Sequence, residues 1–317
     1  MSKVKIGIDM MGGDYAPSEA VKGLALYLND DSHETHLVCI GNEAEVKPLL
    51  ESYGIASDSR IQLVHAPETI GYNEHPTKAL KEKQQSSIAI GFQLLAMGKI
   101  DAFVSAGNTG AMLVGAMYSI KTVEGVLRPT IPTLVPKLNG SMGVLLDVGL
   151  NADCKPEHLN QFAILGSEYA KSVLNINNPR VGLLNVGEEA EKGNLLCQAT
   201  YPLLKENKQI NFIGNIEGRD LFKNNADVVV CDGFTGNIVL KMAESIYEMA
   251  AHRHLENDEF FHRFHYENYG GTPVLGIAKP VIIGHGISND KAFKNMFVQA
   301  EKMFDSDFCD KVKMNFS

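Results

Sequence analysis

Three short turns rich in glycine, asparagine, threonine and aspartate carry the residues best suited to chemistry. They span Asp9–Asp14, Gly107–Gly110 and Asp232–Asn237, and each follows a short apolar run typical of a β-strand. The second and third turns lead directly into apolar runs of helical period. A turn that opens a helix leaves backbone N–H groups unpaired beside the positive end of the helix dipole. Because that arrangement binds anions, the sequence predicts an α/β enzyme that handles phosphate or a phosphorylated small molecule.

The side chains of these turns, and of two further strand ends, make up the predicted binding site. Asn108 and Thr109 offer donors, while the flanking glycines let the backbone approach an anion closely. Asp232 would orient neighbouring donors or act on protons, since a carboxylate repels phosphate. Each turn also has a plainer interpretation as a helix cap or a structural turn. The predicted phosphate- or substrate-binding residues are Asp9, Gly12, Gly13, Gly107, Thr109, Gly110, Asp147, Asn151, Asn185, Gly233, Thr235 and Gly236.

Several familiar catalytic patterns are missing from the sequence. It has no G-x-S-x-G nucleophile elbow, no G-x-x-x-x-G-K-[ST] loop and no H-E-x-x-H zinc motif. His262 and His265 follow Glu259 at a spacing that would place them on one side of a helix. A solvated or interfacial face is a better interpretation of them than a metal site. His285 follows a predicted strand and is a candidate pocket residue.

Composition favours a globular cytoplasmic protein and argues against one that binds nucleic acid. With 317 residues, 44% of them apolar and 21% charged, the chain reads as an ordinary globular protein, and its net charge of −9 argues against nucleic-acid binding. Five cysteines without a C-x-x-C pair, an N-terminus that leads directly into a strand, and the lack of a run of about 20 apolar residues favour a cytoplasmic protein. Association with a membrane surface stays open. Basic residues in the middle of the chain either solvate a surface or dock an acidic partner: Lys78, Lys81, Lys83, Lys121, Arg128 and Lys137.

Strands and helices alternate along the whole chain, from strand Lys3–Asp9 to the last helix Ser288–Met303. Near-continuous apolar strands between helices predict a mainly parallel sheet covered on both faces, with ligands at the carboxyl ends of its strands. One long helix is expected from about Thr77 to Met97. The charged and aromatic stretch His252–Tyr266 breaks the pattern and suggests a helical arm, near residues 245–268, at a subunit interface or against lipid. The chain is expected to form a single α/β domain over residues 1–317.

Seven segments, in order, match a known family. The chain resembles, nearly end to end, the phosphate acyltransferases of bacterial phospholipid synthesis, which make acyl phosphate from an acyl chain on acyl carrier protein and inorganic phosphate. The segments that carry the resemblance are IGIDMMGGDYAP (Ile6–Pro17), SAGNTGA (Ser105–Ala111), LLDVGLNADCKPEHL (Leu145–Leu159), PRVGLLNVGEEAEKGN (Pro179–Asn194), NFIGNIEGRDLF (Asn211–Phe222), ADVVVCDGFTGNIVLK (Ala226–Lys241) and YGGTPVLGI (Tyr269–Ile277).

The resemblance implies a three-layer α/β/α Rossmann-like fold related to isocitrate and isopropylmalate dehydrogenases and to phosphotransacetylase. It also implies a homodimer with neither a metal nor a redox cofactor. Further implications are acyl carrier protein as partner, peripheral contact with the inner face of the membrane, and hand-off of the product to a membrane glycerol-3-phosphate acyltransferase. The stretch between Lys241 and Tyr269, which in the family supplies a helical arm, looks shorter here.

The mechanism follows from the substrates. Phosphate is a ready nucleophile at neutral pH, and the thiolate that leaves has a parent pKa near ~8.5, so neither strong base nor strong acid assistance is required. The enzyme must supply position and fixed donors for the oxyanion. We therefore expect Asn108, Thr109 and Gly110 to hold phosphate. The remaining assignments give Asp232 an orienting role, make Thr235 and Asn237 donors to the oxyanion or phosphate, and let Lys192 or His285 add a charge or a proton.

Three alternatives stay open. A phosphotransacetylase-like enzyme would use acyl-CoA as donor. A dehydrogenase of the related fold would need a metal-binding aspartate cluster, and Asp305, Asp307 and Asp310 at the C-terminus look solvated instead. A non-catalytic regulator would bind phosphate or acyl chains without turnover.

Overall fold

The computed structural model describes residues 4–30, 32–255 and 257–317 and divides into two compact units. Unit 1 comprises Met1–Lys121 and Tyr266–Asp305, and unit 2 comprises Thr122–His265 and Ser306–Ser317. Lys3, the first residue of the expected strand Lys3–Asp9, and Glu256, within the expected arm, lie outside the described residues.

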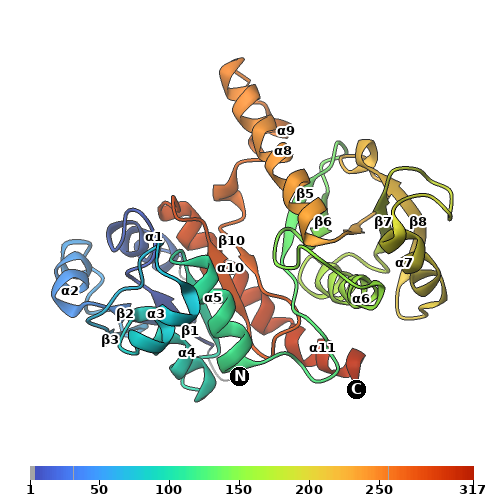
Figure 1. The fold of residues 1–317 in the computed structure, drawn as a ribbon. Helices are drawn as coiled ribbons and strands as arrows, with labels where there is room; N and C mark the ends of the chain where they lie inside the picture. The colour runs from blue at the N-terminus through green and yellow to red at the C-terminus, as the bar shows by residue number, and fades with distance from the viewer. Residues whose placement is uncertain (1–3, 31, 256) are drawn as a thin grey trace. The chain divides into compact units, whose positions relative to one another are not determined.

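Unit 1 is built on a six-stranded sheet of order β10-β11-β4-β1-β2-β3 (Figure 1). All neighbouring strands run parallel except β10 and β11. Apolar residues such as Ile6, Ile8 and Phe103 are fully buried in the strands, as in sheets covered on both faces. The strands are β1 (Lys5–Asp9), β2 (His36–Gly41), β3 (Ile61–His65), β4 (Ala102–Ser105), β10 (Gly271–Pro273) and β11 (Val281–Gly284).

Helices pack on this sheet in two groups. α1 packs closely against α10, because Gly23 leaves no side chain between them; a Cβ there would lie 2.5 Å from Cβ of Phe293. In the second group α4 contacts the sheet, α5 and η1, and α3 packs on α5. The helices are α1 (Ser18–Leu28), α2 (Glu43–Ser52), α3 (Pro76–Glu82), α4 (Ser87–Ala96), α5 (Thr109–Gly115), the π-helix η1 (Ala116–Ile120), the 3-10 turn η3 (Tyr266–Asn268) and α10 (Asp290–Asp305).

The single helix expected from Thr77 to Met97 is wrong, because the chain forms α3 and α4 with a break between them. Lys83 leaves the helical region at φ −104° and ψ 65°. Ser86 then accepts a hydrogen bond from the Ala89 N–H at 3.3 Å and starts a new helix as its N-cap. The residues before Ser86, Lys81–Gln85, are polar helix formers without glycine or proline, which is why the pattern alone joined the two helices.

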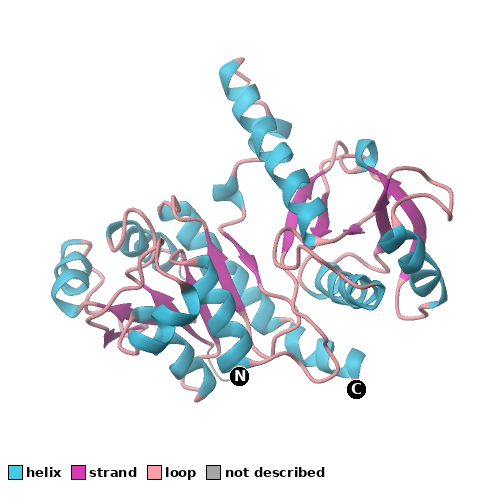
Figure 2. Ribbon diagram, in the orientation of Figure 1, coloured by secondary structure: helices cyan, strands magenta, loops and turns pink. Residues whose placement is uncertain are grey.

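Unit 2 contains a five-stranded sheet of order β5-β6-β9-β7-β8, drawn with its strands in magenta in Figure 2. Only β5 is antiparallel to its neighbour. It lies at the edge and both begins and ends with proline, a residue that edge strands tolerate. The strands are β5 (Pro132–Pro136), β6 (Met142–Leu146), β7 (Arg180–Asn185), β8 (Asn211–Glu217) and β9 (Val228–Val230).

Helix α6 lies at the centre of the helical layer of unit 2, in contact with β6, β9, α7 and α11. α8 begins directly after β9 and is followed by the short α9. Arg263, just beyond α9, donates to the Lys137 carbonyl at 3.2 Å, which ties this segment to the β5–β6 hairpin. The helices are α6 (Pro156–Ser172), α7 (Leu195–Glu206), the 3-10 turn η2 (Gly218–Asp220), α8 (Gly233–His252), α9 (Glu259–His262) and α11 (Phe308–Phe316).

One of the basic residues expected at the surface is buried instead. Lys137 is only 1% exposed, and its Nζ donates to Oδ1 of Asp227 at 2.9 Å. The Arg180 guanidinium binds the same carboxylate, with Nε 2.9 Å from Oδ2. The hydrogen bonds from Arg180 and Lys137 outweigh the effect of burial and lower the pKa of Asp227. Lys137 therefore stabilises the fold and is not available to dock a partner.

The α/β class and the mainly parallel strand arrangement are confirmed, although the strands form two sheets where one was expected. That the whole chain acts as one domain stays a prediction. None of the helices in residues 4–30, 32–255 and 257–317 combines the length and apolar content that crossing a bilayer requires.

Candidate functional site

A buried carboxylate organises the first turn of unit 1. Asp9, 1% exposed at the end of β1, accepts a hydrogen bond from Ser105 Oγ at 2.6 Å and from the Met11 N–H at 3.0 Å. Ser105 Oγ in turn accepts the Gly107 N–H at 2.9 Å. Burial raises the pKa of Asp9, while hydrogen bonds from Ser105, Ser87, Met11 and Gly12 act in the opposite direction. Asp9 therefore joins the ends of β1 and β4.

The two glycines of the first turn allow close packing between turns. A Cβ on Gly12 would lie 2.6 Å from the Gly107 nitrogen, and Gly13 adopts φ +114°, a region that favours glycine. The Asp14 N–H donates to the Gly286 carbonyl at 2.7 Å, which brings the turn after β11 alongside. His285, in that turn, is exposed, and its ring lies 5.7 Å from the ring of Tyr266.

Asn108 is the N-cap of α5 and is almost fully engaged within the protein. Its Oδ1 accepts the Ala111 N–H at 2.9 Å, and its Nδ2 donates to the carbonyls of Gly71, Tyr72 and Glu74. The side chain is buried. The backbone N–H groups of residues 108–110, by contrast, have no acceptor in the described part of the chain. The turn thus presents free backbone donors at a helix start, with exposed Thr109 beside them.

In unit 2, a second buried carboxylate follows β6. Asp147 is fully buried, and its Oδ2 accepts both the backbone N–H and Nδ2 of Asn151 at 2.7 Å. Nδ2 of Asn151 also donates to the Pro129 carbonyl at 2.8 Å. Burial raises the pKa of Asp147, and the hydrogen bonds from Asn151, Leu150 and Ile131 oppose that effect. Asp147 and Asn151 therefore fix this turn internally.

The turn after β9 is positioned on that of β6. Gly233 donates its N–H to the Asn151 carbonyl at 2.7 Å, and a Cβ on Gly236 would overlap the Asp147 carbonyl oxygen. Asp232 caps α8: its Oδ1 accepts the Thr235 N–H at 2.9 Å and its Oδ2 accepts Oγ1 of Thr235 at 2.8 Å. Asn237 is exposed on the first turn of α8, where its side chain would contact a Cβ added at Gly149.

Asn185 and Lys192 belong to a separate loop at the end of β7. Nδ2 of Asn185 donates to the Lys192 carbonyl at 3.0 Å, and its Oδ1 accepts the Val186 N–H at 2.8 Å. Lys192 is exposed, and its aliphatic stem lies against Gly187. Because β7 and β9 are parallel neighbours, this loop lies at the same edge of the sheet as Asp232.

The cysteines of this region are not poised as nucleophiles. Burial raises the pKa of Cys154 to about 11 and that of Cys197 above its ordinary value, and it places the pKa of Cys231 well above the ordinary value. Since the thiolate is the reactive form, these thiols are held in the unreactive state. These three thiols are therefore poorly suited to act as nucleophiles.

The predicted residues thus fall into two groups, each at the carboxyl edge of its own sheet. In unit 1 the structure brings together Asp9, Gly12, Gly13, Gly107–Gly110 and His285. In unit 2 it brings together Asp147, Asn151, Gly233, Asp232, Thr235, Gly236 and Asn237, with Asn185 and Lys192 on the neighbouring loop. That both groups face one cleft stays a prediction.

Sequence reasoning missed two residues that complete the unit 1 group. Ser105 is the last residue of β4 and bridges Asp9 to Gly107, and Tyr72 donates its hydroxyl to the Ala106 carbonyl at 2.8 Å. A serine that ends a strand beside a glycine turn is a signal that could have identified Ser105. Tyr72 lies in a loop far from β4 in the sequence and carried no such signal.

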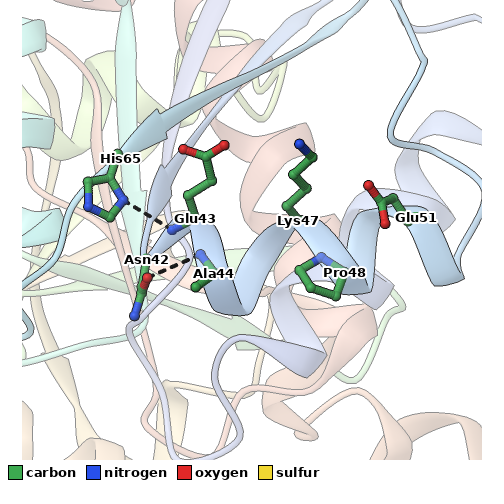
Figure 3. A pocket seen from close by; sticks show the side chains of 7 residues that line it. All are labelled: Asn42, Glu43, Ala44, Lys47, Pro48, Glu51 and His65. Atoms are coloured by element: carbon green, nitrogen blue, oxygen red, sulfur yellow. Dashed lines mark hydrogen bonds between the residues drawn. The ribbon is translucent and has the colours of Figure 1, made fainter.

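A surface hollow of about 450 Å³ lies elsewhere in unit 1, at the start of α2 and the end of β3 (Figure 3). His65 Nδ1 accepts the Glu43 N–H at 3.2 Å, and Asn42 caps the helix. Glu43 and Glu51 flank Lys47, so the hollow has no net preference for an anion. None of the predicted site residues lines it. In residues 4–30, 32–255 and 257–317, no three His, Cys, Asp or Glu side chains converge as metal ligands.

Comparison with known proteins gives consistent matches. A family model described as "Fatty acid synthesis protein" matches residues 4–260 and 250–311. A protein named "Phosphate acyltransferase" from Dictyoglomus turgidum is 43% identical over 318 residues, which cover 95% of this chain and 94% of the relative. Its namesake from Aquifex aeolicus is 41% identical over 330 residues, 98% of this chain and 96% of the relative.

Solved structures of phosphotransacetylases share the fold. The Streptococcus pyogenes phosphotransacetylase superposes with a TM-score of 0.70 at 18% identity, covering 95% of this chain and 94% of that one. A branched-chain phosphotransacylase from Enterococcus faecalis gives a TM-score of 0.63 at 14% identity, covering 94% and 98%. At these identities the likeness concerns the fold alone.

The double engagement of Asn108 leads to a stability prediction. Asn108→Ala removes both the cap of α5 and the bonds to three loop carbonyls, so we expect the free energy of unfolding to fall by about 2 kcal/mol or more. Asn42→Ala is the matched control, because Asn42 caps α2 in the same unit but is only partly buried, and its Nδ2 donates to Glu45 of the same helix and not to a loop. It should cost about 1 kcal/mol. Urea denaturation measures both, and equal losses would contradict the loop-holding role of Asn108.

Proposed function

Because the chain belongs to the phosphate acyltransferase family and is an acyltransferase that acts on phosphate, we propose that its acyl donor is a long-chain acyl group on acyl carrier protein. The product would be acyl phosphate for phospholipid synthesis. The choice of donor rests on the family match, and the phosphate site rests on the start of α5, where backbone N–H groups of residues 108–110 are unpaired beside exposed Thr109. Fixed donors at a helix start suit phosphate.

The proposed step needs little acid–base assistance. An oxygen of hydrogen phosphate attacks the thioester carbonyl carbon, the new C–O bond forms and the C–S bond breaks. The proton of hydrogen phosphate balances the leaving thiolate, which becomes the free carrier thiol. Positioning and stabilisation of the oxyanion then supply most of the rate enhancement.

Each turn is assigned a part in this step. We propose that Thr109 and Gly110 bind phosphate directly, while Asn108 holds their turn. Thr235 and Asn237 would donate to the oxyanion or phosphate. Residues that shape the turns would act through packing and hydrogen bonds, and Lys192 or His285 would add a charge or a proton. The shaping residues are Asp9, Gly12, Gly13, Gly107, Asp147, Asn151, Asn185, Gly233 and Gly236.

The same proposal includes the fold group to which the chain belongs and its location in the cell. We place the fold with the isocitrate and isopropylmalate dehydrogenase-like α/β/α group, and the protein in the cytoplasm at the inner face of the membrane. There it would pass its product to a membrane glycerol-3-phosphate acyltransferase. Neither a metal nor a redox cofactor is required by the proposed step.

The decisive experiment measures release of free carrier from palmitoyl-acyl carrier protein with and without phosphate, each against a reaction without enzyme. Hydroxylamine, which also cleaves thioesters, is added only after the remaining acyl carrier protein has been removed, so that it traps acyl phosphate alone. We expect release above the enzyme-free rate only with phosphate, and a trapped acyl hydroxamate. Palmitoyl-CoA at the same concentration is the comparison, and it should react more slowly. Release without phosphate would indicate a thioesterase, faster reaction with the CoA donor a phosphotransacetylase-like enzyme, and binding without release a regulator.

Asp232 provides a test of the second turn. Asp232→Ala frees the Thr235 hydroxyl from its bond to Oδ2, so we expect kcat/KM for phosphate to fall at least about 10-fold. Asp258→Ala is the control, because Asp258 caps α9 in the same unit by accepting the N–H groups of Phe260 and Phe261. It should leave kcat/KM unchanged. An Asp232→Ala enzyme as fast as wild type would remove Asp232 from the mechanism.

We propose that α8 joins two copies of the chain. Only Gly233, Gly236 and Ala250 of its 20 residues are buried, and Phe234, Ile238, Met242 and Met249 are exposed. Phe234, Ile238 and Met242 recur every fourth residue and so lie on one face of the helix. Sedimentation velocity should give a dimer for wild type and for the Glu248→Gln control, and a monomer for Met242→Glu. A wild-type monomer that instead co-sediments with phosphatidylglycerol vesicles would assign this face to lipid.

A further inference from the structure

A short loop in unit 1, Thr69–His75, runs against the start of α5; we name it the strap. Asn108 Nδ2 donates to its carbonyls at Gly71, 2.9 Å, and at Tyr72 and Glu74, both 3.2 Å. The following helix, α3, begins at Pro76, and a Cβ on Gly110 would collide with the Pro76 ring. The strap therefore lies directly beside the turn that presents free backbone N–H groups.

The strap is also held at its other end. Glu74 Oε1 accepts the Gly71 N–H and Lys83 Nζ, each at 2.6 Å, and Lys83 Nζ donates to the Thr69 carbonyl at 2.8 Å. These bonds close the loop upon itself. The hydrogen bond from Lys83 is the main cause of a lowered pKa at Glu74, so this carboxylate stays charged at neutral pH.

Tyr72 connects the strap to the turns after β4 and β11. Its hydroxyl donates to the Ala106 carbonyl at 2.8 Å. A Cβ on Gly286 would lie 3.0 Å from the hydroxyl oxygen, so the ring packs on the turn after β11. The side chain is 47% exposed, and burial together with Asp14 and Asp9 raises its pKa to about 12, which keeps the hydroxyl protonated.

The turn after β1 is held partly through its own carboxylate and partly through the turn after β11. The Met11 N–H donates to Oδ1 of Asp9 at 3.0 Å, and the Asp14 N–H donates to the Gly286 carbonyl at 2.7 Å. Tyr72 packs on Gly286 and bonds the carbonyl of Ala106, which precedes the turn whose backbone N–H groups are unpaired. One side chain thereby sets the turn after β11 relative to the donors of the turn after β4.

We propose that Tyr72 is a positioning residue for phosphate, whose hydroxyl fixes the turn after β4 so that the backbone N–H groups of residues 108–110 are held in place to bind the anion. The inference rests on the proposed function, in which phosphate binds at the start of α5. It assigns no proton transfer to Tyr72.

The test compares Tyr72→Phe with wild type in the carrier-release assay, varying phosphate and the acyl donor separately. Loss of the hydroxyl bond should raise KM for phosphate about 3- to 10-fold, which corresponds to about 0.7–1.4 kcal/mol. We expect kcat and KM for the acyl donor to change less than about twofold, a split that a general loss of stability would not give. Tyr53→Phe is the control, because Tyr53 is 43% exposed in the same unit and lies after α2.

A second variant tests whether a change in KM comes from the Tyr72 hydroxyl itself or from altered packing of the strap. Glu74→Gln weakens the Lys83 bond but keeps Tyr72, so it should leave KM for phosphate near that of wild type. An unchanged KM in Tyr72→Phe, or the same rise in Glu74→Gln, would overturn the proposal. If wild type shows no phosphate-dependent release, the proposed function fails instead. Calorimetric titration with inorganic phosphate then still tests Tyr72, since weaker binding to Tyr72→Phe supports its role and equal binding overturns it.

Discussion

A buried carboxylate at the end of a central strand supports the candidate site in each unit. Asp9 after β1 and Asp147 after β6 are both almost inaccessible to water, and each accepts backbone N–H groups from the turn that follows it. Burying a carboxylate is costly unless hydrogen bonds compensate, so the turn must keep the one conformation that supplies them. The pKa values of Asp9 and Asp147 reflect the same balance, because burial raises each pKa and the hydrogen bonds act to lower it.

Because each turn must keep the conformation that serves its buried carboxylate, some backbone N–H groups bond within the protein and others stay available to a ligand. In the first turn the Met11 and Asp14 N–H groups bond within the protein, whereas those of residues 108–110 at the start of α5 have no acceptor in the described part of the chain. In unit 2 Asp232 occupies the Thr235 N–H and hydroxyl together, and Gly233 is tied to Asn151. A reaction that needs position more than proton transfer is well served by such turns. The raised pKa values of the neighbouring thiols fit the direct transfer proposed above, which uses no protein nucleophile.

The sequence predicted what depends on local pattern. Apolar runs followed by Gly, Asn and Asp located the strand ends, and the parallel arrangement then placed Asp9 near Gly107 and Asp147 near Gly233. It could not predict partners that meet only in three dimensions. Lys137 looked like a surface lysine because Asp227 is 90 residues away along the chain. Tyr72 reaches Ala106 across 34 residues. The break before α4 depends on Ser86 capping a helix after a polar run, Lys81–Gln85, that contains no glycine or proline to mark it.

Glycine makes both arrangements possible by letting backbones approach. At Gly12 a side chain would press on the Gly107 nitrogen, and at Gly236 it would overlap the Asp147 carbonyl. Either would separate a turn from the carboxylate that holds it, and the buried charge would lose hydrogen bonds that it cannot replace with water. The glycines flagged as anion-binding from the sequence therefore have a physical role even before a ligand arrives: they allow the short contacts on which the donor geometry depends.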